Sequence, residues 1–248
     1  MKSAPKNDDE SQRQSDGGVA REHPRARYRG VLLLALLAAV VAAAICAAYW
    51  PVLSAQAISF DDAQFVTENP LVQNPSWQSA GQFLSEVRKP STVKGYYLPL
   101  SMISLMLDYA AGGRPDDLRA FHRTSLALHV LNSVLVIVLI YSLFQQVWPA
   151  ALLGLLFGLH PLTVEPVAWV GERKTLLAAF FALWCLILYV RYTRNARWRW
   201  AVASLVMYLL ALLSKPTAAP LPLLLLLLDW WPLRRIGKRA CSTNCRMC

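Results

Sequence analysis

Residues 31–50, VLLLALLAAVVAAAICAAYW, decide the fold class, because no charged side chain interrupts them. A helix of about 20 residues rises roughly 30 Å, the thickness of a bilayer's hydrocarbon core. The motif SAQA at residues 54–57 resembles a signal-peptide cleavage site. The apolar run is longer than a signal core of about 7 to 15 residues and follows a long polar tail. We therefore interpret it as an uncleaved first membrane helix.

The composition extends this interpretation to the whole chain. Of 248 residues, 56% are hydrophobic and 16% are charged, which is typical of an integral membrane protein. The net charge is +10, but the basic residues cluster at the ends of apolar segments, where topology signals occur. We predict no nucleic-acid partner.

Five further apolar segments predict an all-α, polytopic fold with about six transmembrane helices. They cover residues 123–144, 148–159 with flanks, 175–192, 200–214 and 217–231. Residues 1–30 have few large apolar side chains to bury, so they are expected to form a disordered tail. The transmembrane domain is predicted to cover residues 31–233, with a large outer loop at 51–119.

Arginine and lysine in the short connections predict the orientation. Basic clusters occur at residues 21–29, 191–199 and 234–239. With six spans all three fall on one side, which the positive-inside rule makes cytoplasmic together with both termini. The outer side then receives residues 51–119, a hinge at 160–174 and a turn at 215–216.

The outer loop offers two features with alternative interpretations. Asp61 and Asp62 follow the first span closely, and neighbouring carboxylates tend to retain a proton or a cation. Such a pair is also typical of a helix start, where aspartate caps free N–H groups. Residues 96–113 are apolar with one acid, Asp108, and suit an interfacial helix or a re-entrant segment.

The hinge concentrates polar residues in a way that a plain connection does not require. These residues are His160, Glu165, Glu172, Arg173 and Lys174, and Lys215 is predicted on the same outer face. A carboxylate there can accept a proton from a hydroxyl, while cations neutralise a lipid-linked phosphate. The alternative is structural: Arg173 and Lys174 snorkel at a helix end and His160 caps the preceding span.

Five sequence blocks, in order, resemble a known family. They are FDDAQFVTENPLVQNPSW, YYLPLSMISLMLDYAAGG, FHRTSLALHVLNSVLVIVLI, HPLTVEPVAWVGERKTLLAAFFALWCLILYVRY and LSKPTAAPLPLLLLLLDWWPL. Together they resemble the membrane half of bacterial proteins that join a multispanning domain to tetratricopeptide repeats. These are similar to the eukaryotic transmembrane and tetratricopeptide-repeat O-mannosyltransferases of the GT-C superfamily.

The resemblance implies roles for particular residues. Asp61 and Asp62 occupy the place of the catalytic or metal-linked acid, with Glu165 assisting. Arg173, Lys174 and Lys215 would contact the donor phosphate, supported by His160, Glu172 and Asp108. The sequence departs from the family at Thr175, where an aspartate is usual, and at Leu98, where a polar or basic residue is usual.

The C-terminal segment departs further from the family. Residues 234–248, RRIGKRACSTNCRMC, show no 34-residue repeat. We expect a cytoplasmic basic and cysteine-containing tail at a truncated or frame-shifted end, so that the chain is an N-terminal fragment. Cys241, Cys245 and Cys248 lack the surrounding fold that an iron–sulfur site needs.

The resulting hypothesis is a glycosyltransferase module at the outer face of a bacterial cytoplasmic membrane. It would transfer a sugar from a polyprenyl-phosphate donor to a hydroxyl of a protein or other acceptor, with a divalent cation as an open option and no other cofactor. Whether the fragment is an active enzyme stays open. One alternative is a non-catalytic anchor for a repeat domain or partner. A transporter is disfavoured because the predicted span centres are nearly free of polar groups.

Overall fold

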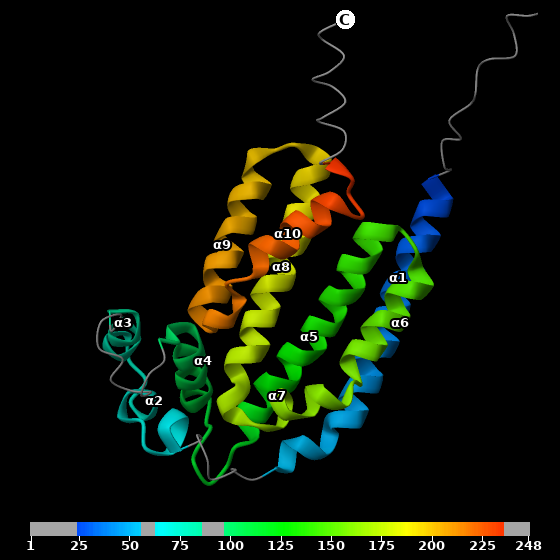
Figure 1. The fold of residues 1–248 in the computed structure, drawn as a ribbon. Helices are drawn as coiled ribbons and strands as arrows, with labels where there is room; N and C mark the ends of the chain where they lie inside the picture. Colours follow the sequence, from blue (N-terminus) through cyan, green and yellow to red (C-terminus); the bar gives the residue numbers. More distant parts are fainter. Residues whose placement is uncertain (1–23, 56–62, 86–96, 236–248) are drawn as a thin grey trace, which may run out of the picture.

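The computed structural model describes residues 24–55, 63–85 and 97–235 (Figure 1). These residues form helices and connections, and no strand is present among them. Four long helices run side by side: α1 (Pro24–Tyr49), α5 (Arg119–Phe144), α8 (Arg173–Asn195) and α9 (Trp198–Ser214). The all-α prediction is confirmed for the described part of the chain.

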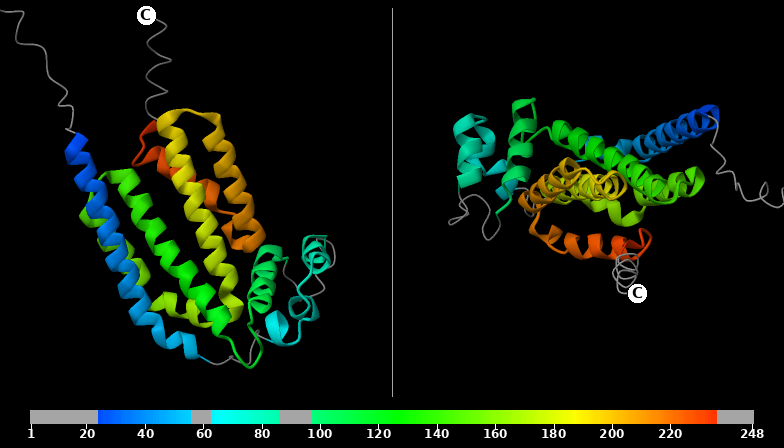
Figure 2. Two further views of the ribbon diagram at one scale, coloured as in Figure 1. Left: turned by 180° about the vertical axis from the view of Figure 1, so that it is seen from behind. Right: turned by 90° about the horizontal axis from the view of Figure 1, so that it is seen from above.

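Helix α6 (Val147–Gly158) lies beside α5 and α1, and a hinge of short helices leads from it to α8 (Figure 2). The hinge consists of η3 (Pro161–Thr163), α7 (Val164–Ala168) and η4 (Val170–Glu172). After α9, the turn η5 (Pro216–Ala218) leads to α10 (Leu221–Trp230), which packs on α8. The predicted apolar segments are therefore helical, with ends shifted by a few residues.

The predicted count of six spans is wrong. Three helical segments in the described residues are long and apolar enough to cross a membrane: Tyr28–Ser54, Arg119–Phe144 and Val170–Asn195. Helix α6 and the segment Pro161–Ala168 meet at a 55° bend and add a fourth span only if they are taken together. Helix α10 has 10 residues and rises only about 15 Å. Prolines at 216, 220 and 222 delay its start, because proline removes a backbone donor.

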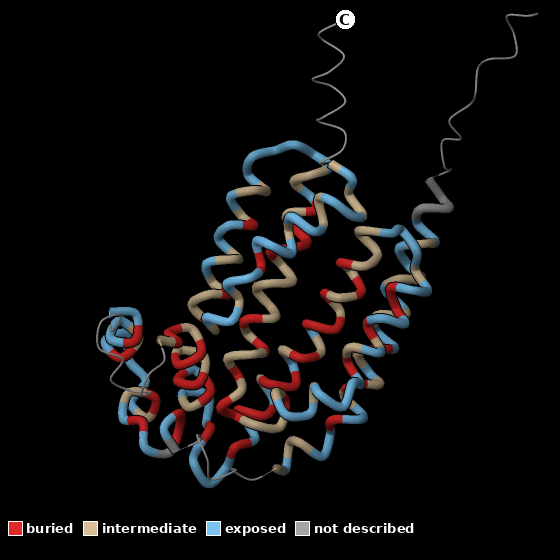
Figure 3. Tube along the Cα trace, in the orientation of Figure 1, coloured by how far each residue is buried: buried red, intermediate tan, exposed pale blue. Residues whose placement is uncertain are grey.

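The tail and the outer loop also differ from the prediction. Residues 24–30, expected to be disordered, form the first two turns of α1, and residues 1–23 lie outside the described part. The loop contains η1 (Trp50–Ser54), η2 (Ala63–Thr67), α2 (Pro70–Gln73), α3 (Trp77–Ser85) and α4 (Pro99–Ala110). Helix α4 corresponds to the predicted interfacial helix, but half of its residues are buried against protein. Figure 3 shows this buried face.

Three hydrophobic clusters hold these elements together. One joins α2, α3 and α4 to Phe121 and Val170, so the outer loop packs on the ends of α5 and η4. A second joins α1, α5 and α6 around Ile45 and Ile137. The third joins α5, α8 and α10 around Ile187. The outer loop thus packs beside one end of the bundle, with α4 against α5, α8 and α9 (Figures 1 and 2).

The two ends of the bundle differ in what they carry. The described chain ends and the α8–α9 turn lie at one end, and α2, α3, α4 and the hinge lie at the other (Figures 1 and 2). Arg29 and the basic residues of 191–199 and 234–235 therefore share the first end. This grouping agrees with the one-sided arrangement that the arginines predicted.

Glycine lets α6 approach its neighbours closely, and this contact can be tested. A Cβ at Gly158 would lie 2.2 Å from Ile45 Cδ1 and 2.9 Å from Ser133 Oγ. We expect Gly158→Ala to lower the free energy of unfolding by about 1 to 3 kcal/mol through overpacking. Unfolding in mixed micelles titrated with a denaturing detergent measures it. Gly81→Ala, with no atom within 4 Å of the new Cβ, is the control and should not destabilise the protein.

Candidate functional site

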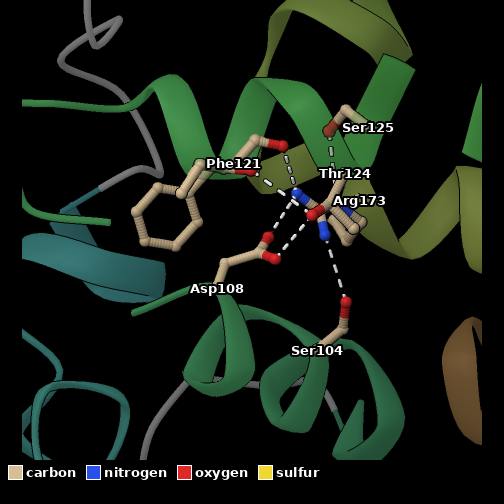
Figure 4. Close-up of polar contacts among 7 residues, drawn as sticks. Ser104, Asp108, Phe121, Thr124, Ser125 and Arg173 are labelled. Carbon is tan, nitrogen blue, oxygen red and sulfur yellow. Dashed lines mark hydrogen bonds and ion pairs between the residues drawn. The ribbon is translucent and has the colours of Figure 1, made fainter. Parts of the chain in front are cut away.

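Arg173 is the first residue of α8 and its side chain is fully buried, at 0% exposed. Its Nε donates to Ser125 Oγ at 3.1 Å, and its Nη1 donates to Ser104 Oγ at 3.1 Å. Its Nη2 donates to the carbonyl oxygen of Phe121 at 2.6 Å. Figure 4 shows these groups surrounding the guanidinium. A buried cation is tolerated only when its donors are satisfied in this way.

Asp108 on α4 supplies the counter-charge. Its Oδ2 lies 2.8 Å from Arg173 Nη2, and its Oδ1 accepts a hydrogen bond from Thr124 Oγ1 at 2.6 Å. Burial raises the pKa of the Asp108 carboxyl, and the adjacent Arg173 guanidinium and the Thr124 hydroxyl oppose that rise. The ion pair and these hydrogen bonds join α4, α5 and α8.

This geometry changes the interpretation of Arg173. The idea that Arg173 snorkels at a helix end is wrong, because no part of its side chain is exposed. A lipid phosphate would have to displace Asp108 and two serine hydroxyls to reach the guanidinium. We therefore assign Arg173 and Asp108 to holding the outer loop on the bundle, and leave Arg173 out of the proposed phosphate-binding set.

A second polar cluster forms where η4 meets the end of α9. Glu172 Oε1 lies 3.1 Å from Lys174 Nζ, and Glu172 Oε2 lies 3.3 Å from Lys215 Nζ. The Thr175 hydroxyl donates to Glu172 Oε2 and accepts from Lys215 Nζ at 2.7 Å. The predicted residues 172, 174 and 215 are thus brought together, although Lys174 and Lys215 are 41 positions apart in the sequence.

This Lys174–Glu172–Lys215 cluster is partly open to solvent. The side chains of Lys174 and Glu172 are 15% exposed and that of Lys215 is 25% exposed. Two cations and one anion give the cluster a net charge of +1. Lysine ammonium groups carry three donors each, so both retain donors for an incoming anion. The arrangement suits a singly charged acid group.

Of the remaining predicted residues, His160 and Glu165 belong to neither polar cluster. His160 is exposed and caps η3, since its Nδ1 accepts from the N–H of Leu162 at 3.2 Å. Glu165 is exposed in the first turn of α7 and has no ion-pair partner among the described residues. Asp61 and Asp62 lie outside the described residues.

The residues that flank the aspartate block contact the two helices of the site. The carbonyl oxygen of Ala55 lies 3.2 Å from Nε2 of His122 on α5. On the other side, Phe65 is buried and its ring centroid lies 5.0 Å from Lys174 Nζ. Within the described ranges, no group of three or more His, Cys, Asp and Glu side chains is placed to hold a metal ion.

Polar residues within α5 were missed from the sequence. His129, Asn132 and Ser133 are fully buried near the middle of this helix, so the statement that span centres are nearly free of polar groups is wrong. His129 Nε2 lies 2.9 Å from the carbonyl oxygen of Gly158, and Asn132 Nδ2 donates to the carbonyl oxygen of Leu176 at 3.0 Å. They join α5 to α6 and α8. Their three- to four-residue spacing, together with Ser125, is the signal that could have revealed them.

The fold and these clusters define a helical membrane protein in which the Arg173–Asp108 pair and the Lys174–Glu172–Lys215 cluster lie at the same end of the bundle. Its sequence is similar to those of curated proteins named protein O-mannosyl-transferases. It is 30% identical over 182 residues to Tmtc2 of Drosophila melanogaster. The aligned region covers 68% of this chain and 19% of the relative. It is 30% identical over 185 residues to TMTC1 of Mus musculus, covering 71% of this chain and 19% of the relative.

A third relative, TMTC3 of Homo sapiens, is 26% identical over 164 residues, covering 61% of this chain and 16% of the relative. The chain thus spans about a fifth of the length of the curated relatives it matches. No family model matches the chain. No solved structure matches it significantly. The similarity supports the expected relationship to the eukaryotic O-mannosyltransferases.

Proposed function

We propose that the chain is a module of a membrane glycosyltransferase of the GT-C type. It acts on a sugar linked to a polyprenyl phosphate and on a hydroxyl acceptor, with a protein as the first candidate because the relatives are named protein O-mannosyl-transferases. The observation that carries the proposal is the half-buried Lys174–Glu172–Lys215 cluster at the end of the bundle. An anchor alone needs no such cluster.

The charge of the cluster favours this donor class. A sugar linked through one phosphate to a polyprenyl chain is a phosphodiester with one negative charge, which the net charge of +1 would neutralise. Glu172 holds both ammonium groups at about 3 Å and so fixes their positions before the donor arrives. The Thr175 hydroxyl hydrogen-bonds both Glu172 and Lys215 and adds no charge to the cluster.

The acceptor side of the proposal rests on carboxylates. Asp61 or Asp62 would take the proton from the acceptor hydroxyl, with Glu165 assisting. In a variant of this scheme, the aspartates bind a divalent cation. The sugar's anomeric carbon forms a bond to the acceptor oxygen, its bond to the phosphate oxygen breaks, and the polyprenyl phosphate leaves with those electrons. The contacts of Ala55 with His122 and of Phe65 with Lys174 favour this scheme, because they tie the block's flanks to α5 and α8.

Removing one ammonium should weaken donor binding. A hydrogen bond to a charged group contributes about 1.5 to 3 kcal/mol, so we expect Lys215→Met to raise the Kd for polyprenyl-phosphate-mannose about 10- to 100-fold. Binding of the radiolabelled donor to the purified chain measures this. Arg234→Met is the matched control and should leave the Kd unchanged, because it changes the segment that follows α10, at the opposite end of the bundle (Figure 1).

The same assay separates the enzyme module from a non-catalytic anchor. An anchor would bind the donor no more tightly than it binds a polyprenyl alcohol. Lys215→Met would then change the affinity for neither compound. That result would remove the phosphate site and leave the chain as a scaffold for a repeat domain or partner.

We further propose that the outer loop and hinge face the outside of a bacterial cytoplasmic membrane, with both termini cytoplasmic. Single cysteines replace Gln64, Ala168 and Ala196 in a chain whose natural cysteines are removed. We expect positions 64 and 168 to react with a membrane-impermeant thiol reagent in intact cells, and position 196 to react only after lysis. Labelling at position 196 in intact cells, with protection at positions 64 and 168, would show that the orientation is opposite to the one proposed.

A further inference from the structure

An apolar groove of about 470 Å³ lies between α5 and α6, away from the lysine cluster's residues. Helices α5 and α6 run side by side in Figures 1 and 2. Its walls are Val136, Ile140, Leu153, Leu156 and Phe157. Leu153 and Leu156 are 41% and 59% exposed, so the groove opens on the surface that faces lipid in a membrane.

The end of the groove is formed by the break between α6 and the hinge, where His160 and Thr163 line it. Backbone groups freed by a break inside a membrane protein must find other partners. Here the carbonyl of Gly158 is bonded to His129, and the carbonyl of His160 accepts from the Thr163 hydroxyl at 2.6 Å. The Thr163 oxygen also contacts Tyr49 Oη at 2.8 Å. The break is thus fixed by side chains, and Thr163 has no donor left.

His160 is the remaining donor at this end. Its Nδ1 accepts from the N–H of Leu162, which fixes the neutral ring in the form that carries its proton on Nε2. Nε2 has no partner in the part of the chain that the structure describes. The groove therefore combines an apolar trough with one N–H donor at its end.

The size of the groove indicates that it holds one aliphatic chain rather than a protein helix. Two turns of a helix about 10 Å wide occupy roughly 850 Å³, more than the groove holds. One aliphatic chain along α6 with an acidic oxygen at His160 fits both the lining and the donor.

We propose that this groove is a specific site for a bilayer phospholipid. One acyl chain lies between α5 and α6, and a phosphate oxygen accepts the Nε2–H of His160. The bound lipid supports the break between α6 and the hinge. The proposal does not depend on sugar transfer.

Photo-crosslinking in native membranes tests the site. A benzophenone amino acid replaces Leu156 in the groove, or Leu209 on α9 or Leu224 on α10, which are 49% and 40% exposed outside it. We expect phospholipid adducts, identified by mass spectrometry, to be at least about tenfold more frequent at 156 than at the two control positions. His160→Ala should remove most of that difference, and His160→Gln, which keeps an N–H donor, should retain part of it.

Four results would overturn the proposal. Equal labelling at all three positions would mean bulk lipid only. A protein adduct at 156 would make the groove a docking surface for another helix, and enrichment of polyprenyl phosphate there would assign it to the donor's chain. If labelling at 156 stays high in His160→Ala, the headgroup contact is wrong.

Discussion

Replacing Arg173 with methionine should lower the free energy of unfolding by about 3 to 5 kcal/mol, the effect expected when one partner of a buried ion pair is removed. The substitution leaves the buried Asp108 carboxylate, the buried Ser125 hydroxyl and the partly buried Ser104 hydroxyl without their cation. Unfolding in mixed micelles, followed by tryptophan fluorescence, measures the change.

The double variant Arg173→Met with Asp108→Leu provides the strict control. Because it removes both charges, we expect it to recover most of the lost stability, as apolar replacement of a whole buried pair is often neutral or stabilising. Lys174→Met changes an adjacent, partly exposed cation and should cost about 1 kcal/mol or less. If Arg173→Met costs no more than Lys174→Met, the pair does not hold the outer loop on the bundle.

The sequence predicted the helices well because their signal is local. An apolar run such as residues 31–50 must be helical in lipid, where every backbone group needs an internal partner. The number of spans was less predictable, since it depends on where a run stops. Prolines shorten α10 and the His160–Pro161 break divides the third span, and neither effect follows from hydropathy alone.

The sequence predicted which residues belong to the candidate site, but not what each of these residues does. Glu172, Arg173 and Lys174 are consecutive, so on a helical turn they point about 100° apart. Arg173 turns toward α4 and α5, whereas Glu172 and Lys174 turn toward Lys215. Which residue turns inward depends on how α8 packs against its neighbours. Ser104 and Thr124 were missed because a single hydroxyl in an apolar helix has no distinctive pattern.

The prediction with the largest expected effect concerns the aspartates of the FDD block. We expect Asp61→Asn or Asp62→Asn to lower the rate of sugar transfer by about 10²- to 10⁴-fold, the usual cost of losing a general base. Binding of the donor should change little, because asparagine leaves the Lys174–Glu172–Lys215 cluster intact. The rate is measured in the longest version of the protein that transfers sugar from polyprenyl-phosphate-mannose.

Comparison with Lys215→Met distinguishes a base from a binding residue. Lys215→Met should raise the Kd and KM for the donor, whereas the aspartate variant should lower kcat and kcat/KM together. Added divalent cation tests the metal-linked form of the proposal. If an aspartate binds the cation, replacing that aspartate should raise the metal concentration needed for sugar transfer. If both aspartate variants transfer sugar at the unmodified rate, the base is elsewhere. Asp61 and Asp62 then revert to the helix-start interpretation, and Glu165, exposed in the first turn of α7, becomes the next carboxylate to replace.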